Sequence, residues 1–283
     1  MSPLLTLVLL AFALMRVPAW AASPGFIGSG EIPTPYLPST QVAVEEMLRL
    51  ADVKESDVVV DLGSGDGRIP ITAALAFGAR GFGVDIDAKL VEEANENAKK
   101  AGVEQRVRFF QRDVFETDIR EASVVTLYLL SGLVNRLQPK LMKELRPGTR
   151  IVAHDFPFKD WTPDRSVTIS KNYYLYIVPA AVAGTWRLEA TMPSGQYSYQ
   201  IDIRQDHQKV TGGARAGGGG FLPLFEPRLE GEHIRFVLVD DGHAHHFEGR
   251  VRGNLMEGRV RSGIGKQITE QSWRAERVLP ATE

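Results

Sequence analysis

The stretch VVVDLGSGDGR, residues 58–68, decides the fold. Three β-branched residues run directly into an acid and a loop with glycine at alternate positions, which is typical of a buried strand that turns sharply beneath a ligand. The glycines are Gly63, Gly65 and Gly67. A dinucleotide fingerprint needs its third glycine three residues after the second, and Arg68 stands there instead. The pattern therefore indicates a strand, a turn and a helix that hold some other ligand.

The charge of this turn argues against ligands that bind through a phosphate group. Asp61 and Asp66 would repel a phosphate, which a helix N-terminus otherwise attracts. An acidic, glycine-rich turn favours a cation instead. S-adenosylmethionine is such a ligand, because it carries a sulfonium and an ammonium group beside an adenosine.

At these residues the chain resembles the Rossmann-like, class I S-adenosylmethionine-dependent methyltransferases, whose first motif is an acid, any residue and then G-x-G-x-G. A second short strand ends at Asp85, roughly 20 residues after the glycine turn, where doubly wound folds place a carboxylate on the ribose hydroxyls. A third strand leads to Asp113, where the family puts an acid on the adenine amino group beside an apolar contact. The resemblance implies S-adenosyl-L-methionine as cofactor, held by Asp61, Gly63, Gly65, Gly67, Asp85, Ile86, Asp113 and Val114. The alternative is a Rossmann-like domain whose acids only cap strand ends.

The segment before the first helix narrows the resemblance. Residues 35–40 read PYLPST and precede an amphipathic helix that reaches about Leu50. This Tyr-x-Pro segment, followed by DLGSGDGRI, resembles a small family of methyltransferases that modify protein lysines, including mitochondrial members tethered by an N-terminal hydrophobic stretch. The resemblance implies that Tyr36 helps to close the cofactor pocket. The alternative is an entry segment stiffened by proline, with a buried aromatic ring.

The N-terminal sequence predicts that the protein is exported. Residues 4–15, LLTLVLLAFALM, form an apolar run shorter than the ~20 residues that span a bilayer, and Ala19-Trp20-Ala21 fits a small-x-small cleavage site. We therefore expect a signal peptide over residues 1–22, an extended lead-in over 23–38 and an exported, periplasmic or otherwise extracytoplasmic protein. An uncleaved membrane tether is the alternative.

The remaining pattern predicts two folded domains. Crossover helices are expected at 69–77, 88–101 and 135–145, and strands at 107–111, 124–130 and 151–153, with antiparallel strands 167–169 and 173–178 closing a seven-stranded sheet. This methyltransferase domain, an α/β sheet with helices on both faces, covers residues 39–180. Beyond it apolar and polar residues alternate, which is the pattern of half-buried strands. This predicts a small antiparallel β-sheet or barrel of about six to eight strands over 181–283.

Methyl transfer from a sulfonium needs alignment of donor and acceptor rather than a protein nucleophile. If the acceptor is a lysine, its ammonium group must first lose a proton, and a nearby sulfonium favours this loss. A carboxylate at a strand end can then orient the amine. The candidate is Asp155, with Tyr128 and His154 as further candidates. The alternative for Asp155 is an acid that caps a loop or a helix.

Composition and the remaining motifs limit the partners and the chemistry that this chain can have. The formal net charge of −2 provides no basic field, so nucleic acid is not expected as a partner. The chain has no cysteine, which excludes disulfides and thiolate chemistry. The histidines of DGHAHH, at 243, 245 and 246, are interpreted as a solvated hairpin turn, and no metal site is assigned.

These patterns together predict an S-adenosylmethionine-dependent methyltransferase that N-methylates a lysine of a protein partner and associates with a membrane if its N-terminus is retained. Asp61, Asp85 and Asp113 favour an enzyme, since a scaffold freed from cofactor binding has no physical reason to hold all three. Two alternatives stay open. One is a small-molecule or RNA acceptor, and the other is a non-catalytic extracytoplasmic binding protein on a methyltransferase scaffold.

Overall fold

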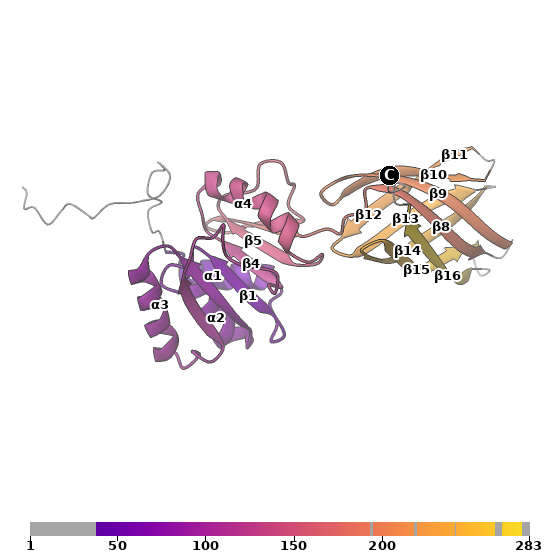
Figure 1. Cartoon of the computed structure of the whole chain (residues 1–283). Coiled ribbons are helices and arrows are strands. Elements are labelled where there is room, and N and C mark those ends of the chain that lie inside the picture. The colour runs from indigo at the N-terminus through magenta and orange to yellow at the C-terminus, as the bar shows by residue number, and fades with distance from the viewer. Residues whose placement is uncertain (1–37, 193–194, 218–219, 241, 264–267, 279–283) are drawn as a thin grey trace, which may run out of the picture. The chain divides into compact units, whose positions relative to one another are not determined.

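The computed structural model describes residues 38–192, 195–217, 220–240, 242–263 and 268–278. The predicted signal peptide, Tyr36 and most of the predicted lead-in lie outside these ranges. No helix within them is long and apolar enough to cross a membrane. The described chain forms a mixed sheet followed by an antiparallel one (Figure 1).

The first sheet has seven strands in the order β3-β2-β1-β4-β5-β7-β6. Neighbours from β3 to β5 are parallel, whereas β7 runs antiparallel to both β5 and β6. The predicted seven-stranded α/β sheet is thereby confirmed, and the chain order reverses between β1 and β4, where open sheets of this type bind ligands. The strands are β1 (Val58–Leu62), β2 (Arg80–Asp85), β3 (Val107–Gln111), β4 (Val124–Leu127), β5 (Arg150–His154), β6 (Arg165–Thr168) and β7 (Asn172–Ile177).

Helices cover both faces of this sheet. Adjacent residues of β1 point to opposite faces: Val59 packs in a core with residues of α1 and α2, and Val60 packs in another core with residues of α4. Helix α4 begins four residues before its predicted start. The prediction missed this first turn because the sequence LSGL contains a glycine, which disfavours helix in isolation. The helices are α1 (Gln41–Leu50), α2 (Arg68–Phe77), α3 (Ala88–Lys100) and α4 (Ser131–Glu144).

Asp57 holds together the starts of three neighbouring strands. Its side chain is 5% exposed; Oδ1 accepts from Ser123 Oγ at 2.7 Å, and Oδ2 accepts from the Lys54 amide at 2.7 Å. The Arg150 guanidinium also pairs with this carboxylate. These contacts lie at the starts of β1, β4 and β5, so they stabilise the edge of the sheet opposite the strand ends that carry the candidate acids.

We expect Asp57→Ala to lower the free energy of unfolding by about 3 kcal/mol, because it leaves a largely buried Arg150 guanidinium without its carboxylate. Urea denaturation measures this loss. The matched control is Asp118→Ala, which removes an exposed pair with Arg120 and should change stability little. A loss no larger than that of the control would contradict this role of Asp57.

The second sheet has nine antiparallel strands in the order β11-β10-β9-β8-β16-β15-β14-β13-β12. The prediction of about six to eight strands was too low, because glycine and proline in GGARA, FLP and FEPRLE obscured the period of β10 to β12. The two edge strands, β11 and β12, are separated in the chain only by Leu224, whose amide donates to the Gly212 carbonyl of β10 at 3.0 Å, so the sheet is nearly closed. The strands are β8 (Gly184–Met192), β9 (Gly195–Asp206), β10 (Lys209–Ala216), β11 (Phe221–Pro223), β12 (Phe225–Glu230), β13 (His233–Asp240), β14 (His243–Arg252), β15 (Leu255–Ser262) and β16 (Thr269–Arg277).

This second sheet encloses an apolar core of its own, drawn from residues 180–275. Phe236, Phe247 and Trp273 form mutual ring contacts inside it, and the Arg277 guanidinium lies 4.2 Å from the ring centroid of Trp186. The buried residues of the first sheet form separate clusters within 43–178. The domain boundary between residues 180 and 181 stays a prediction.

The interpretation of DGHAHH as a solvated hairpin turn was wrong in placing its histidines in the turn, although His243 and His246 are exposed. Asp240 already pairs with His243, so the chain has reversed before the first of them and all three lie in β14. His245 is buried, and its Nδ1 lies 2.7 Å from Ser262 Oγ. The described residues contain no cluster of three or more side chains suited to bind a metal.

Candidate functional site

The glycine turn between β1 and α2 lies at the point where the strand order reverses. Gly63, Gly65 and Gly67 have φ angles of 84°, 52° and 82°, a region that residues with a Cβ rarely adopt. The amides of Gly63 and Ser64 both donate to the Val84 carbonyl of β2 at 2.9 Å. The alternate glycines predicted to turn beneath a ligand therefore form a tight loop anchored to the neighbouring strand.

Asp85, at the end of β2, holds this loop through its carboxylate. Oδ2 accepts from the Gly65 amide at 2.9 Å, and Oδ1 accepts from the Asp87 amide at 3.0 Å. A carboxylate can accept about four hydrogen bonds, so each oxygen keeps capacity for a further donor. Sequence reasoning placed Asp85 correctly beside the turn but missed that it also fixes the backbone of the turn.

Asp61 lies in β1 beneath the same turn and is 2% exposed. Its Oδ1 accepts from Thr126 Oγ1 at 2.6 Å. Burial raises the pKa of Asp61 to about 7; Asp85 and Asp66 act in the same direction, while the hydrogen bond from Thr126 acts against it. The carboxyl therefore changes charge near neutral pH, and a cation placed beside it would favour the ionised form.

A pocket of about 450 Å³ lies beyond the ends of β2 and β3. Two predicted site residues, Ile86 and Asp113, share this pocket although they come from different strand ends. Asp113 Oδ1 accepts from the Phe115 amide at 2.8 Å, and Val114 packs against the core of the sheet. The lining consists of Ile86, Gln111, Arg112, Asp113 and Glu116.

Three aromatic rings stack where β4 and β5 end and β7 begins. The rings of Tyr128 and His154 are 4.0 Å apart, and those of His154 and Tyr173 are 5.1 Å apart. His154 is buried; its Nδ1 lies 3.1 Å from Ser39 Oγ, and its Nε2 has no hydrogen-bond partner among the described residues. Burial lowers the pKa of His154, so the imidazole is neutral at physiological pH and supports the ring of Tyr128 by stacking.

Asp155 follows β5 directly and is held in an unusual backbone conformation. Its φ is 61°, in the left-handed region that non-glycine residues seldom occupy and that recurs at functional sites. Its Oδ2 lies 2.6 Å from Lys171 Nζ, and its Oδ1 accepts from the Asn172 amide at 3.2 Å. Burial acts to raise the pKa of Asp155, but these two hydrogen bonds outweigh it and hold the pKa below the usual range.

Ser39 connects this aromatic stack to the glycine turn. The Arg68 guanidinium donates to the Ser39 carbonyl and also pairs with the Asp66 carboxylate, with Nε 2.9 Å from Oδ1. Ser39 Oγ in turn contacts His154. Ser39 is thus fixed between the glycine turn and the aromatic stack, the two halves of the edge at which β1 to β5 end; this edge is called the crevice below. No local sequence pattern predicts this connection across 115 positions.

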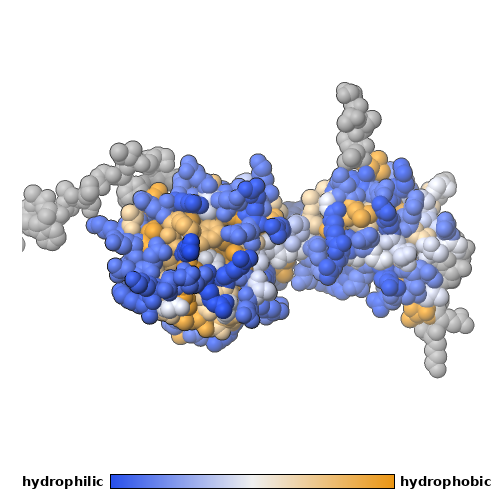
Figure 2. Space-filling view, turned by 60° about the horizontal axis from the view of Figure 1, so that its bottom comes forward, coloured by the Kyte–Doolittle hydropathy of each residue, from blue (hydrophilic) through white to orange (hydrophobic). Residues whose placement is uncertain are grey.

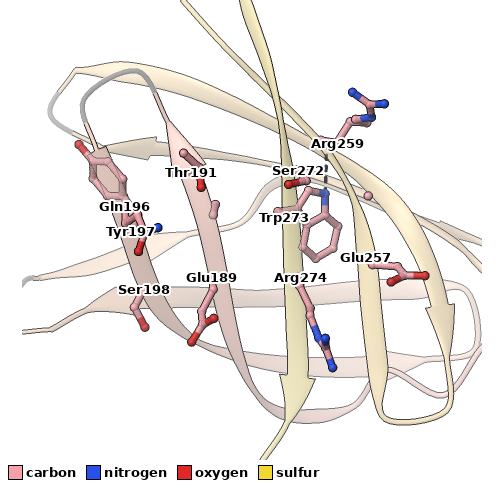
Figure 3. A pocket seen from close by; sticks show the side chains of 12 residues that line it. Glu189, Thr191, Gln196, Tyr197, Ser198, Glu257, Arg259, Ser272, Trp273 and Arg274 are labelled. Carbon is pink, nitrogen blue, oxygen red and sulfur yellow. Dashed lines mark hydrogen bonds between the residues drawn. The ribbon is translucent and has the colours of Figure 1, made fainter.

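A second hollow, of about 700 Å³, lies on β8, β9, β15 and β16 of the other sheet (Figure 3). Its side chains are mainly polar and carry both signs of charge, with Glu189, Arg274 and Glu257 coming from three neighbouring strands. Much of the described surface is likewise hydrophilic, with smaller apolar areas between (Figure 2). None of the acids at the strand ends of the first sheet lines this hollow, so we place the candidate site in the crevice of the first sheet.

Residues 61–165 match the ANTKMT methyltransferase domain family. The match contains Asp61, Asp85, Asp113, Tyr128 and Asp155, and it ends before the second sheet begins. Hence the similarity concerns the crevice of the first sheet.

Several known proteins are similar to this part of the chain. A protein-lysine N-methyltransferase of Saccharolobus islandicus is 42% identical over 150 residues, which are 51% of this chain and 93% of that protein. The adenine nucleotide translocase lysine N-methyltransferase of Mus musculus is 34% identical over 130 residues, which are 46% of this chain and 56% of that protein. A solved structure of an RNA methyltransferase from Salinibacter ruber, in complex with S-adenosyl-L-homocysteine, is 50% identical with a TM-score of 0.51, over 52% of this chain and 96% of that one.

Proposed function

We infer the function of this chain from one premise: it belongs to the S-adenosylmethionine-dependent protein-lysine N-methyltransferases, since it is 42% identical to nearly the whole of the Saccharolobus islandicus enzyme. It is an enzyme that takes a methyl group from S-adenosylmethionine and attaches it to the side-chain nitrogen of a protein lysine. The observation that carries this function is the set of acids at successive strand ends around the left-handed glycine turn.

We propose that the crevice binds the cofactor along the edge formed by β1, β2 and β3. Asp85 would accept hydrogen bonds from both ribose hydroxyls, while Ile86, Asp113 and Val114 would contact the adenine. The backbone of the glycine turn could approach the ligand closely, because its three glycines carry no side chains. The Asp61 carboxylate beneath the turn would attract the positively charged sulfonium and ammonium groups of the ligand. Tyr36, which the structure does not describe, is proposed to help close the pocket, as the family resemblance of its Tyr-x-Pro segment implies.

At the other end of the crevice we propose that Asp155 and Tyr128 receive the acceptor amine. When bound, S-adenosylmethionine supplies a methyl group on a sulfonium whose sulfur becomes neutral as the group leaves. The acceptor ammonium must first lose a proton to water, and the Asp155 carboxylate then accepts a hydrogen bond from the amine and orients its lone pair. Tyr128, supported by the neutral His154, forms the adjoining wall and limits the access of water.

Binding of S-adenosylmethionine should tighten as the pH rises through the pKa of Asp61, which is about 7 in the free protein. The protonated carboxyl cannot offset the ligand's positive charge, so the affinity should fall roughly fivefold to tenfold between pH 7.5 and pH 6. Calorimetric titration over this range tests the proposed pocket. Asp61→Asn should remove the dependence, and an identical pH profile for the variant would show that Asp61 does not face the ligand.

RNA is a second candidate acceptor, because the similar Salinibacter ruber structure is described as an RNA methyltransferase. Charge argues against it here. The chain has a formal net charge of −2, and the acids that end the strands of the crevice, Asp85 and Asp155 among them, repel a polyanion. Identification of the methylated residue in a labelling experiment with both kinds of acceptor separates the two.

We propose further that the protein acts outside the cytoplasm, on the strength of the apolar run at residues 4–15 and the cleavage pattern at Ala19-Trp20-Ala21. N-terminal sequencing of the protein from its native source should then begin near Ala22 or Ser23. A chain that keeps Met1 and fractionates with membranes would instead support the tether, and one that keeps Met1 in the soluble cytoplasmic fraction would contradict both.

A further inference from the structure

Lys171 lies at the place where a substrate lysine is expected. It belongs to the turn between β6 and β7, residues 169–171, and β7 starts beside the end of β5. That turn therefore lies at the same edge of the sheet as Tyr128 and Asp155. Lys171 Nζ is 2.6 Å from Asp155 Oδ2, which is the contact that the proposed function assigns to an acceptor amine.

The carboxylate that Lys171 contacts is fixed in place. The left-handed backbone of Asp155 and the hydrogen bond from the Asn172 amide leave its side chain little freedom, and it is only 16% exposed. Lys171 is different, because 52% of its side chain is exposed and its four-carbon stem is flexible. Water can thus reach the ammonium group. The hydrogen bond to Asp155 raises the pKa of Lys171, so the nitrogen must move away from the carboxylate, which stays in place, before it loses its proton.

We propose that Lys171 is a methyl acceptor of this enzyme and is modified within its own molecule. The proposal rests on the proposed function, since it places Lys171 Nζ in the position of the substrate amine. The Lys171 ammonium releases a proton to water, and its lone pair attacks the methyl carbon of bound S-adenosylmethionine. The new N–C bond forms as the C–S bond breaks, and the sulfur keeps the bonding pair as a neutral thioether.

Methylation would change the contact that positions Lys171. Each transfer replaces one N–H donor by a methyl group while the positive charge remains. A trimethylated nitrogen has no donor left and cannot hydrogen-bond to Asp155. The fully modified side chain would therefore leave the carboxylate available for a lysine of another protein.

The test incubates the full chain with S-adenosylmethionine that carries a deuterated methyl group, with polylysine added as an external acceptor, and maps the label by peptide mass spectrometry. We expect label on the peptide that contains Lys171, with a rate per molecule that does not change with protein concentration. Lys171→Arg should remove this label, whereas the matched Lys143→Arg, at an exposed position of α4, should leave it unchanged. Asp155→Asn should reduce it at least tenfold.

The outcomes separate the inference from the proposed function. Labelled polylysine with unlabelled Lys171 would overturn the inference and leave the lysine methyltransferase function intact. Label on Lys171 whose rate rises with protein concentration would also overturn it, because transfer would then occur between molecules. Absence of label from every lysine, while the protein binds S-adenosylmethionine, would count against the proposed function itself.

Discussion

Replacing Asp85 with alanine is expected to weaken the binding of S-adenosylmethionine by roughly tenfold to several hundredfold. The variant loses the acceptor proposed for two ribose hydroxyls, and hydrogen bonds to charged groups contribute about 1.5 to 3 kcal/mol each. It also frees the Gly65 amide that Asp85 holds at 2.9 Å, so part of the loss should come from a less ordered glycine turn. Calorimetric titration measures the affinity.

Two further variants isolate the role of Asp85. Asp85→Asn should bind with intermediate affinity, because the amide keeps one acceptor and loses the charge. Asp87→Ala removes a neighbouring acid that caps α3 by accepting from the Lys89 amide, so it should cost about 1 kcal/mol of stability and leave the affinity unchanged. If Asp85→Ala stays folded and binds within about twofold of the parent, the cofactor does not lie at this strand end.

Replacing Gly67 with alanine should lower the free energy of unfolding by about 2 to 4 kcal/mol. The residue has a φ of 82°, and a Cβ there would lie 2.6 Å from the Phe109 ring and 2.9 Å from the Ala94 Cβ. The loop must therefore shift away from α3 and β3, which should also weaken cofactor binding. Chemical denaturation and calorimetric titration measure the two effects.

Gly102→Ala is the matched control for Gly67→Ala. Gly102 has a similar φ of 70°, but a Cβ built there meets nothing within 4 Å. Its replacement should cost only the strain of the left-handed backbone, about 1 kcal/mol, and leave cofactor binding unchanged. Equal losses for the two variants would show that the close approach of Gly67 to Phe109 contributes nothing.

The cofactor half of the crevice could be predicted from sequence because its signals are local. A β-branched run, alternate glycines and acids at strand ends each occupy a few consecutive residues, and the doubly wound fold brings the ends of parallel strands to one edge. The structure places Asp61, Asp85, Ile86 and Asp113 around that edge accordingly. Their contacts with the ligand stay a proposal.

Contacts between distant residues could not be predicted in the same way. Nothing near Ser39 in the sequence indicates that it meets His154, and nothing near Asp57 indicates that it pairs with Arg150. The ion pair of Asp155 with Lys171 was missed as well, although the expected antiparallel strands on either side of residues 170–172 did imply a turn at that edge. The start of β14 was placed too late, because the polar residues of DGHAHH concealed the period of a strand.

The measurement that tests the central claim most directly is the chemical identity of the methylated product. The full chain is incubated with S-adenosylmethionine carrying a labelled methyl group and with an extract that contains both protein and RNA, after which each fraction is hydrolysed and its methylated residues are identified. We predict label in Nε-methylated lysine of the protein fraction, and its loss in Asp85→Ala. Label confined to nucleosides of the RNA fraction would contradict the claim.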